Sequence, residues 1–281
     1  RELGRLYEAC ATGQDDPLSI LPALSIQYKD YAAWQNGLLE NEATIGELRA
    51  YWREQLADLP TLDLPADFAR PALKTYNGAS VQRLFSPELS DRLKDLAEAQ
   101  GATLFMALTA WVKTLLYRYT NQEDIVIGTP SAGRTHPDVH DQIGFYVNTL
   151  ALRSRVDSQA GFEQLLQQVK GTALAAFEHE LYPFDRLVEE LDLPRDMSRS
   201  AVFDVMLVLQ NNEQADLKLG DMDIRLEPAE TGISKFDLTF SFAESPAAGG
   251  LVLNINYNTD LFCPDRIERM CAHLETLLQN V

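Results

Sequence analysis

The sequence has 281 residues, and 46% of them are hydrophobic, which is enough to bury the core of one large domain or of two smaller lobes. Its 24 Lys and Arg residues are outnumbered by 42 Asp and Glu residues, and the formal charge of -18 disfavours nucleic acid and anionic membranes as partners. The three cysteines have no C-x-x-C spacing and no apolar run reaches the roughly 20 residues of a membrane span, so we expect a cytoplasmic protein without a disulfide framework.

The first part of the chain has the spacing of amphipathic helices. Leucine and tyrosine side chains predict a helix that ends near Gly13, and aromatic residues at intervals of three or four predict two more helices over residues 25–39 and 44–59. Residues 59–78 are rich in Pro, Asp and Ala without periodicity, which indicates a long surface connection. Because the sequence starts at Arg1, inside a helical pattern, we expect it to be a piece of a longer protein.

Strands and helices interleave from residue 79 onwards. Ser86 and Pro87 are typical of an N-cap and a first helical position, and the helix that they begin should stop at Gly101. The next helix, residues 103–119, is apolar around most of its circumference, which indicates burial against a sheet. The remaining pattern predicts strands at 81–85, 124–129, 143–153, 202–209, 222–227, 236–243 and 251–257, and helices at 162–179, 183–191 and 264–279. We therefore expect an α/β (α+β) fold in which helices cover one side of a mixed sheet.

The sequence contains no chain-local catalytic or metal motif. It lacks the P-loop and dinucleotide fingerprints, the H-E-x-x-H helix and the G-x-S-x-G elbow. Any histidine could act as a general base near neutral pH, but no neighbouring pattern selects one of the four, which are His136, His140, His179 and His273. We therefore expect no metal site and no directly bound cofactor.

Four segments are more specific when they are taken together. In chain order they are residues 28–34 (YKDYAAW), residues 143–149 (IGFYVNT) running on to Arg153, residues 179–185 (HELYPFD) and residues 195–199 (RDMSR). With the strand end at 257–259 and the terminal helix, they resemble the conserved motifs of the condensation domain of nonribosomal peptide synthetases. The resemblance covers nearly the whole chain. It departs from the family pattern at Asp185, where Glu is usual, and at Ser200 and Ala201, where an Asn-Pro pair is usual.

Several residues of these segments also have a physical interpretation of their own. Tyr28 and Trp34 belong to one helical packing face, and Asp30 projects elsewhere. Gly144 allows a close approach of the backbone to another element. Asn148 stands among apolar neighbours, so it either locks a turn or faces a water-filled passage, and we favour the lock.

The later segments predict a short helix and a charged cluster. Pro183 should open the helix that carries Phe184 inward. Arg195, Asp196 and Arg199 form the cluster, which we interpret as an internal ion-pair network; the alternative is a docking site for a carrier protein.

The resemblance implies a chloramphenicol acetyltransferase-like two-layer sandwich, one of two lobes that form a V with a tunnel between them. Residues 1–77 would be the end of the N-terminal lobe with the interlobe helices and linker, and residues 78–281 would be the C-terminal lobe. Polar residues at strand ends or on a polar strand face are candidates for lining the tunnel: Asn148, Gln210, Ser234 and Asp237. The polar segment 211–221 is a candidate for a crossing between the lobes, and apolar surface should be exposed where the missing lobe would pack.

The resemblance also implies an activity and its partners. An acceptor amine would attack a donor thioester, with both substrates carried on the phosphopantetheine arms of carrier proteins. The partners would be carrier domains, the adjacent adenylation domain and the missing N-terminal lobe. The family's His-His-x-x-x-Asp-Gly segment, whose second histidine is implicated in catalysis, is absent from the sequence, so we assign no catalytic residue and expect the fragment alone to be inactive.

Two alternatives remain open. The first is a non-catalytic docking module that binds carrier proteins, and the second is a sibling activity on the same fold, epimerisation or heterocyclisation. The near-complete motif at residues 143–153 favours ordinary condensation. An intact histidine motif upstream would distinguish an enzyme from a docking module.

Overall fold

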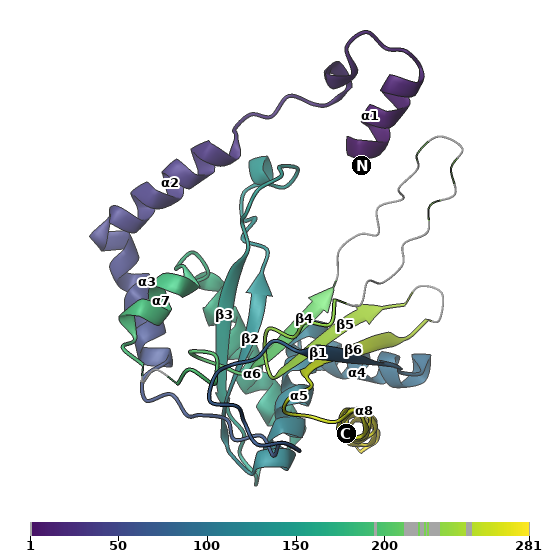
Figure 1. Ribbon diagram of the computed structural model, residues 1–281. Helices are drawn as coiled ribbons and strands as arrows, with labels where there is room; N and C mark the ends of the chain where they lie inside the picture. Colours follow the sequence, from purple (N-terminus) through teal and green to yellow (C-terminus); the bar gives the residue numbers. More distant parts are fainter. Residues whose placement is uncertain are drawn as a thin grey trace.

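The computed structural model describes residues 2–193, 196–210, 219, 222, 224, 231–245 and 249–280. Within these residues, the centre of the fold is a six-stranded sheet with the strand order β1-β6-β5-β4-β2-β3 (Figure 1). The strands are β1 (Gly78–Leu84), β2 (Asp124–Ser131), β3 (Asn148–Arg155), β4 (Val205–Gln210), β5 (Leu238–Glu244) and β6 (Leu251–Asn258). Strand β4 is parallel to β2 and β5, while the other neighbours are antiparallel, so the predicted mixed sheet is confirmed.

Helices cover one face of this sheet, as the sequence predicts. They are α4 (Pro87–Ala99), α5 (Leu104–Thr120), α6 (Phe162–Glu178) and α8 (Pro264–Gln279) (Figure 1). Trp111 of α5 and Phe240 of β5 are fully buried in the core between the two layers. Thr239 and Ser241, which alternate with the apolar residues of β5, are half-buried, as expected for a polar strand face, whereas Asp237, predicted on the same face, is buried.

Local signals set the helix ends. Ser86 accepts a hydrogen bond from a first-turn N–H of α4, and Pro87 occupies the first helical position, as predicted. Thr103 caps α5 in the same way. This helix ends at Asn121, whose φ of 56° is the left-handed conformation that stops a helix.

The N-terminal elements lie to one side of the sheet. They are α1 (Glu2–Ala11), η1 (Pro17–Ile20), α2 (Tyr28–Glu40) and α3 (Glu42–Gln55). Helix α1 lies away from the sheet, whereas α3 lies near its β3 edge and contacts α7 (Phe184–Glu190) (Figure 1). Residues 60–76 connect α3 to β1 without helix or strand, as expected for the linker.

The connection between β2 and β3 corrects one prediction. It contains η2 (Pro137–Val139) and extends beyond the sheet (Figure 1). The strand expected over residues 143–153 begins only at Asn148, because β2 ends directly opposite, at Ser131. Among the described residues no strand lies beside the preceding segment, and its apolar side chains are exposed: Ile143 by 87%, Phe145 by 77% and Val147 by 51%.

Other boundaries differ by smaller amounts. Strand β4 begins at Val205 rather than at residue 202, and α3 ends at Gln55 rather than at residue 59. The strand expected at 222–227 and the crossing segment 211–221 lie mostly outside the described residues. Of those that are described, Leu219 and Met222 form an isolated bridge. In the part of the chain that the structure describes, no helix is both long and apolar enough to cross a membrane.

Candidate functional site

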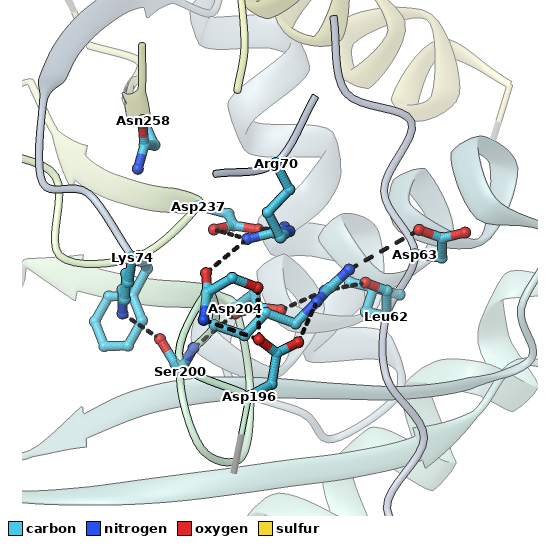
Figure 2. Close-up of polar contacts among 12 residues, drawn as sticks. Leu62, Asp63, Arg70, Lys74, Asp196, Ser200, Asp204, Asp237 and Asn258 are labelled. Atoms are coloured by element: carbon cyan, nitrogen blue, oxygen red, sulfur yellow. Dashed lines mark hydrogen bonds and ion pairs between the residues drawn. The ribbon is translucent and has the colours of Figure 1, made fainter. Parts of the chain in front are cut away.

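A buried ion-pair network lies where β4 and β5 begin (Figure 2). Asp204 directly precedes β4 and Asp237 directly precedes β5, and because these strands are parallel neighbours their first residues lie side by side. Arg70, from the linker, and Arg199, from the loop before β4, reach these two carboxylates. We call these four residues the strand-start network.

Each carboxylate of this network has its own arginine. The Nη1 and Nη2 groups of Arg70 bind the two oxygens of Asp237, and Nη1 lies 3.1 Å from Oδ1. Nη1 of Arg199 lies 2.7 Å from Oδ2 of Asp204 and 2.9 Å from the carbonyl oxygen of Leu62. The side chains of Asp237 and Asp204 are 3% and 6% exposed, and carboxylates this deeply buried need paired cations. The network thereby ties the linker to the sheet.

Burial dominates the electrostatics of this region. It raises the pKa of the Asp237 carboxyl; Arg70 opposes the rise, and the nearby carboxylate of Asp204 adds to it. Burial also lowers the pKa of Lys74, whose Nζ lies 2.5 Å from Oγ of Ser200. Asp237 and Lys74 both bind side chains from distant parts of the chain. The cluster therefore holds the fold together.

The charged cluster at residues 195–199 adjoins the strand-start network. Asp196 accepts hydrogen bonds from the hydroxyl and the N–H of Ser198, at 2.6 and 2.8 Å, and these bonds lower its pKa. Nε of Arg199 lies 3.9 Å from Oδ2 of Asp196. The Arg199 side chain is 16% exposed, so its guanidinium is directed into the domain. Arg195 lies outside the described residues.

A second polar site is centred on Asn148, at the start of β3. Its Nδ2 donates to the carbonyl oxygens of Glu180 and Tyr182, each at 2.7 Å. Its Oδ1 accepts from the N–H groups of Thr149, at 2.8 Å, and Phe184, at 3.1 Å. These four bonds use both donors and both acceptor sites of the amide. Asn148 therefore fastens the segment between α6 and α7 to the start of β3.

The first and second motif segments meet in an aromatic cluster. The ring of Tyr146 lies edge-on to Tyr28 and Tyr31, with centroid distances of 5.3 and 4.6 Å. The hydroxyl of Tyr28 donates to the carbonyl oxygen of Phe145 at 3.0 Å. A Cβ atom on Gly144 would lie 2.5 Å from the ring of Tyr28, so the expected close approach at this glycine is present.

Asp30 and Trp34 lie on the same helix with separate contacts. Oδ2 of Asp30 accepts the N–H of Gln27 at 2.8 Å and completes a capping box at the start of α2. The carboxylate therefore points away from the packing face. The ring of Trp34 lies 5.7 Å from that of Tyr31 and extends the aromatic cluster along α2.

Arg153 joins the end of α3 to the sheet. Its Nε and Nη2 lie 2.9 and 2.7 Å from the two oxygens of Asp124. Its guanidinium also donates to three carbonyl oxygens at or just beyond the end of α3, those of Gln55 at 3.0 Å, Ala57 at 2.5 Å and Asp58 at 3.3 Å. The last carbonyls of a helix have no partner within it, so Arg153 satisfies groups that would otherwise need water.

The third motif segment, which contains His179, Pro183 and Phe184, has structural contacts. The ring of His179 stacks on Tyr51 at a centroid distance of 3.9 Å, and its Nδ1 lies 2.7 Å from the carbonyl oxygen of Ala175. Pro183 is the N-cap of α7, and Phe184 packs against the second core cluster. Within the described residues, no group of three or more His, Cys, Asp or Glu side chains is placed to hold a metal ion.

The four candidate tunnel residues are divided between opposite ends of the sheet. Ser234 and Asp237 lie near the start of β5, and both are buried. Asn148 and Gln210 lie at the other end, because β2 and β4 run parallel and Asn148 pairs with the last residue of β2. Strand β4 is roughly 17 Å long at the usual rise per residue. One small pocket therefore does not hold all four.

Three members of the polar region were missed from the sequence. Asp204 carries the same signal as Asp237, a carboxylate directly before an apolar strand, and could have been found. Arg70 and Lys74 stand in an aperiodic linker without a local signal. The contact between Arg70 and Asp237 joins residues 167 positions apart, which local patterns do not reveal.

Comparisons with known proteins give a consistent result. The model of the condensation domain family matches residues 1–281. A plipastatin synthase protein of Bacillus subtilis (strain 168) is 46% identical over 262 residues, which are 93% of this chain and 7% of that protein. Bacitracin synthase 1 of Bacillus licheniformis is 40% identical over 281 residues, 100% of this chain and 5% of that protein. The chain thus spans a small part of the length of these relatives.

Solved structures share the fold. The X-domain from teicoplanin biosynthesis matches with a TM-score of 0.87 and 27% identity, over 99% of this chain and 64% of that one. The first condensation domain of the calcium-dependent antibiotic synthetase, in complex with a substrate analogue, matches with a TM-score of 0.74 and 20% identity, over 98% of this chain and 58% of that one. The expected chloramphenicol acetyltransferase-like fold is therefore confirmed.

Proposed function

The chain belongs to the condensation domain family of nonribosomal peptide synthetases, and we propose that it supplies one lobe of a domain that joins two carrier-bound acyl groups through an amide bond. In this proposal, residues 78–281 are the C-terminal lobe. Residues 1–77 provide the end of the N-terminal lobe together with the interlobe helices and linker. The partners would be carrier domains, an adenylation domain and the rest of the N-terminal lobe.

The proposed reaction transfers an acyl group from sulfur to nitrogen. The amine nitrogen of the acceptor attacks the thioester carbonyl carbon of the donor, and the tetrahedral intermediate collapses as the C–S bond breaks. The proton released by the amine ends on the thiolate, so the products are an amide and a free thiol. Both substrates would arrive on the phosphopantetheine arms of carrier domains. The contribution of this chain would be to position them.

The observation that carries the proposal is that the first three motif segments meet in one region. Tyr28 of α2 packs on Gly144 and Tyr146, and Asn148 binds the backbone of residues 180–184. These contacts fix α2, the β2–β3 connection and α7 relative to one another, at the end of the sheet where Gln210 also lies. We propose that this end forms the tunnel wall of the lobe, with Asn148 and Gln210 at its surface. Ser234 and Asp237 are buried at the opposite end of the sheet, so they would contribute only by stabilising the fold.

The catalytic histidine is proposed to lie in another part of a longer protein, because the 281 residues contain no His-His-x-x-x-Asp-Gly segment. The test compares the 281-residue chain with a longer protein that includes the upstream region. Each is mixed with a donor and an acceptor carrier protein, both loaded, and the acceptor carrier is followed by intact-protein mass spectrometry. We expect the condensed product with the longer protein only. Product from the chain alone would show that the histidine motif is not required, and no product from either would reject amide formation.

A docking module is the second candidate function. The X-domain from teicoplanin biosynthesis has a higher TM-score with this chain, 0.87, than the condensation domain of the calcium-dependent antibiotic synthetase, 0.74, and that X-domain is also known in complex with OxyB. This candidate predicts that the longer protein binds a carrier protein but yields no condensed product. Binding measured by isothermal titration calorimetry beside the product assay separates the two functions.

A further inference from the structure

Positive charge gathers in one cleft of a strongly negative chain. The cleft has a volume of about 550 Å³ and lies between α5 and α8. Its basic side chains are Arg118 of α5 and Arg266, Arg269 and His273 of α8, and we call these four residues the basic cleft. The formal charge of the whole chain is -18, so an acidic partner is repelled over most of the surface and is attracted only where positive charge is locally dense.

Two of the arginines are free to meet a partner. Arg266 is held by Asp67, at 2.7 Å from its Nε to Oδ1, and Arg266 keeps the pKa of Asp67 well below its usual range. Arg118 and Arg269 are exposed, and in the part of the chain that the structure describes neither forms an ion pair. Glu275 pairs with Arg83 of β1, on another side of α8. Of the three acidic residues of α8, which are Asp265, Glu268 and Glu275, Glu275 is therefore directed away from the basic cleft.

The floor of the basic cleft is apolar. Leu115 of α5 and Leu277 of α8 form it, and at one side the hydroxyl of Tyr119 lies 2.8 Å from Nδ1 of His273. A small inorganic anion would need the arginines but not the leucines. An amphipathic helix uses both, since its apolar side chains can cover the floor while its carboxylates meet the arginines.

The dimensions also fit a helix. Helices α5 and α8 lie side by side in the layer below the sheet (Figure 1), and the indole Nε1 of Trp111 donates to the carbonyl oxygen of Leu274 at 3.0 Å, which fixes their spacing. The residues of α8 that line the cleft extend from Arg266 to Leu277. At 1.5 Å per residue this is roughly 16 Å, or about three turns of a partner helix.

We propose that the basic cleft is a docking site for an acidic amphipathic helix of a partner protein. Such a helix would place carboxylates against Arg118 and Arg269 and an apolar side chain between Leu115 and Leu277. The proposal does not depend on amide formation by the domain, because the cleft uses none of the residues that connect the motif segments.

The binding test uses a synthetic helical peptide as the probe. A fluorescein-labelled 16-residue peptide with Glu and Leu at helical spacing is titrated with the 281-residue chain, and fluorescence anisotropy gives its Kd. Arg118→Glu/Arg269→Glu should weaken binding about tenfold or more, since two attractive pairs become repulsive ones. Arg5→Glu/Arg92→Glu makes the same change in net charge on exposed residues of α1 and α4 and should leave the Kd unchanged. Thr276→Arg adds a charge at an exposed position of the cleft and should tighten binding severalfold.

Each alternative occupant gives a distinct result. An equal loss in both charge-reversed double variants would overturn the proposal, because binding would then follow net charge alone. No gain with Thr276→Arg would also overturn it, because charge added in the basic cleft would then have no effect on binding. Full displacement of the peptide by millimolar inorganic phosphate at constant ionic strength would identify a small-anion site instead. A dimer in sedimentation velocity that Arg118→Glu/Arg269→Glu dissociates would show that a second copy of the chain occupies the cleft. Circular dichroism melting of every variant confirms that the fold is intact.

Discussion

Replacing Arg70 by methionine should destabilise the domain, because the buried carboxylate of Asp237 then has no cation to pair with. The side chain of Asp237 is 3% exposed, and its carboxylate loses both contacts with the guanidinium when Arg70 is removed. Breaking a buried ion pair by removing one partner costs about 3–5 kcal/mol. The Arg70 side chain is 20% exposed, so some water can reach the site, and we expect a loss near the lower end, about 3 kcal/mol in the free energy of unfolding.

The pH dependence distinguishes an unpaired carboxylate from lost packing. Burial raises the pKa of Asp237 in the folded state, so this group contributes stability that is present at low pH and is lost as the pH rises through its folded pKa. Without Arg70 the folded pKa moves further up and the loss grows. The difference between Arg70→Met and the wild type should therefore shrink as the pH falls from neutral towards the ordinary range of an aspartate, about 4.

Urea unfolding followed by the fluorescence of the buried Trp52 and Trp111 measures this effect at each pH. The matched control is Arg70→Met/Asp237→Asn, in which no charge is left unpaired, and it should recover at least half of the loss. A loss below about 1 kcal/mol for Arg70→Met, or a larger loss that is the same at every pH, would refute the argument that Arg70 compensates a buried charge.

Three further predictions test other contacts. Arg153→Lys should lower the free energy of unfolding by about 2 kcal/mol, measured by urea unfolding, because one ammonium cannot replace the five donor contacts of the guanidinium to Asp124 and the end of α3. Burial lowers the pKa of Lys113 to about 7, so between about pH 7 and about pH 10 the folded state binds fewer protons than the unfolded state. The stability of the wild type relative to Lys113→Met should therefore rise over this interval, by at most about 1.4 kcal/mol per pH unit. Gly144→Ala should cost about 1–3 kcal/mol and lower the melting temperature, because the new Cβ would lie 2.5 Å from the ring of Tyr28.

Matched variants control for two of these changes, and each of the last two changes has an outcome that would contradict it. Arg155→Lys alters a neighbouring arginine whose side chain is 78% exposed and should change stability by less than about 0.5 kcal/mol. Gly46→Ala lies inside α3 with nothing within 4 Å of the added Cβ and should stabilise the protein, by up to about 1 kcal/mol. A constant difference between Lys113→Met and the wild type across the alkaline range would show that Lys113 is charged in the folded state throughout. Equal melting temperatures for Gly144→Ala and the wild type would show that the aromatic cluster accommodates the added Cβ without loss of stability.

The elements with strong local signals were predictable from the sequence. Helix α8 has the predicted bounds, Pro264–Gln279, and the cap at Ser86 fixes the start of α4. The error at residues 143–147 has a physical cause. Ile143, Phe145 and Val147 alternate with other residues as in a strand, but a strand needs a hydrogen-bonded neighbour, and β2 has already ended at Ser131. The strand-pairing partner depends on chain topology, which was not visible in the sequence.

The site was predictable only in part, and for a related reason. The sequence indicated that Asn148 must bond within its surroundings, yet its partners come from the segment between α6 and α7, more than 30 residues away. Asp237 was placed on the polar face with Thr239 and Ser241, but β5 begins one residue later, and the carboxylate turns inward to meet Arg70. A pattern of period two assigns a side chain to a face. It does not reveal the cation that makes burial of a carboxylate tolerable.

The motif residues of this lobe act mainly on the backbone, and this bears on how the proposed reaction would be promoted. Asn148 bonds four backbone groups, Arg153 bonds three carbonyls, Asp30 caps an N–H, and Gly144 leaves room for a ring. None of these contacts supplies a nucleophile or a proton; each fixes the position of an element, Asn148 where β2 ends and Arg153 near the opposite end, where β2 begins. Holding two tethered reactants in an attack geometry can by itself supply about 7–11 kcal/mol of a reaction barrier. In the proposed reaction, such contacts would hold the two carrier-bound reactants in place, and the proton transfer would be left to the histidine proposed to lie in another part of a longer protein.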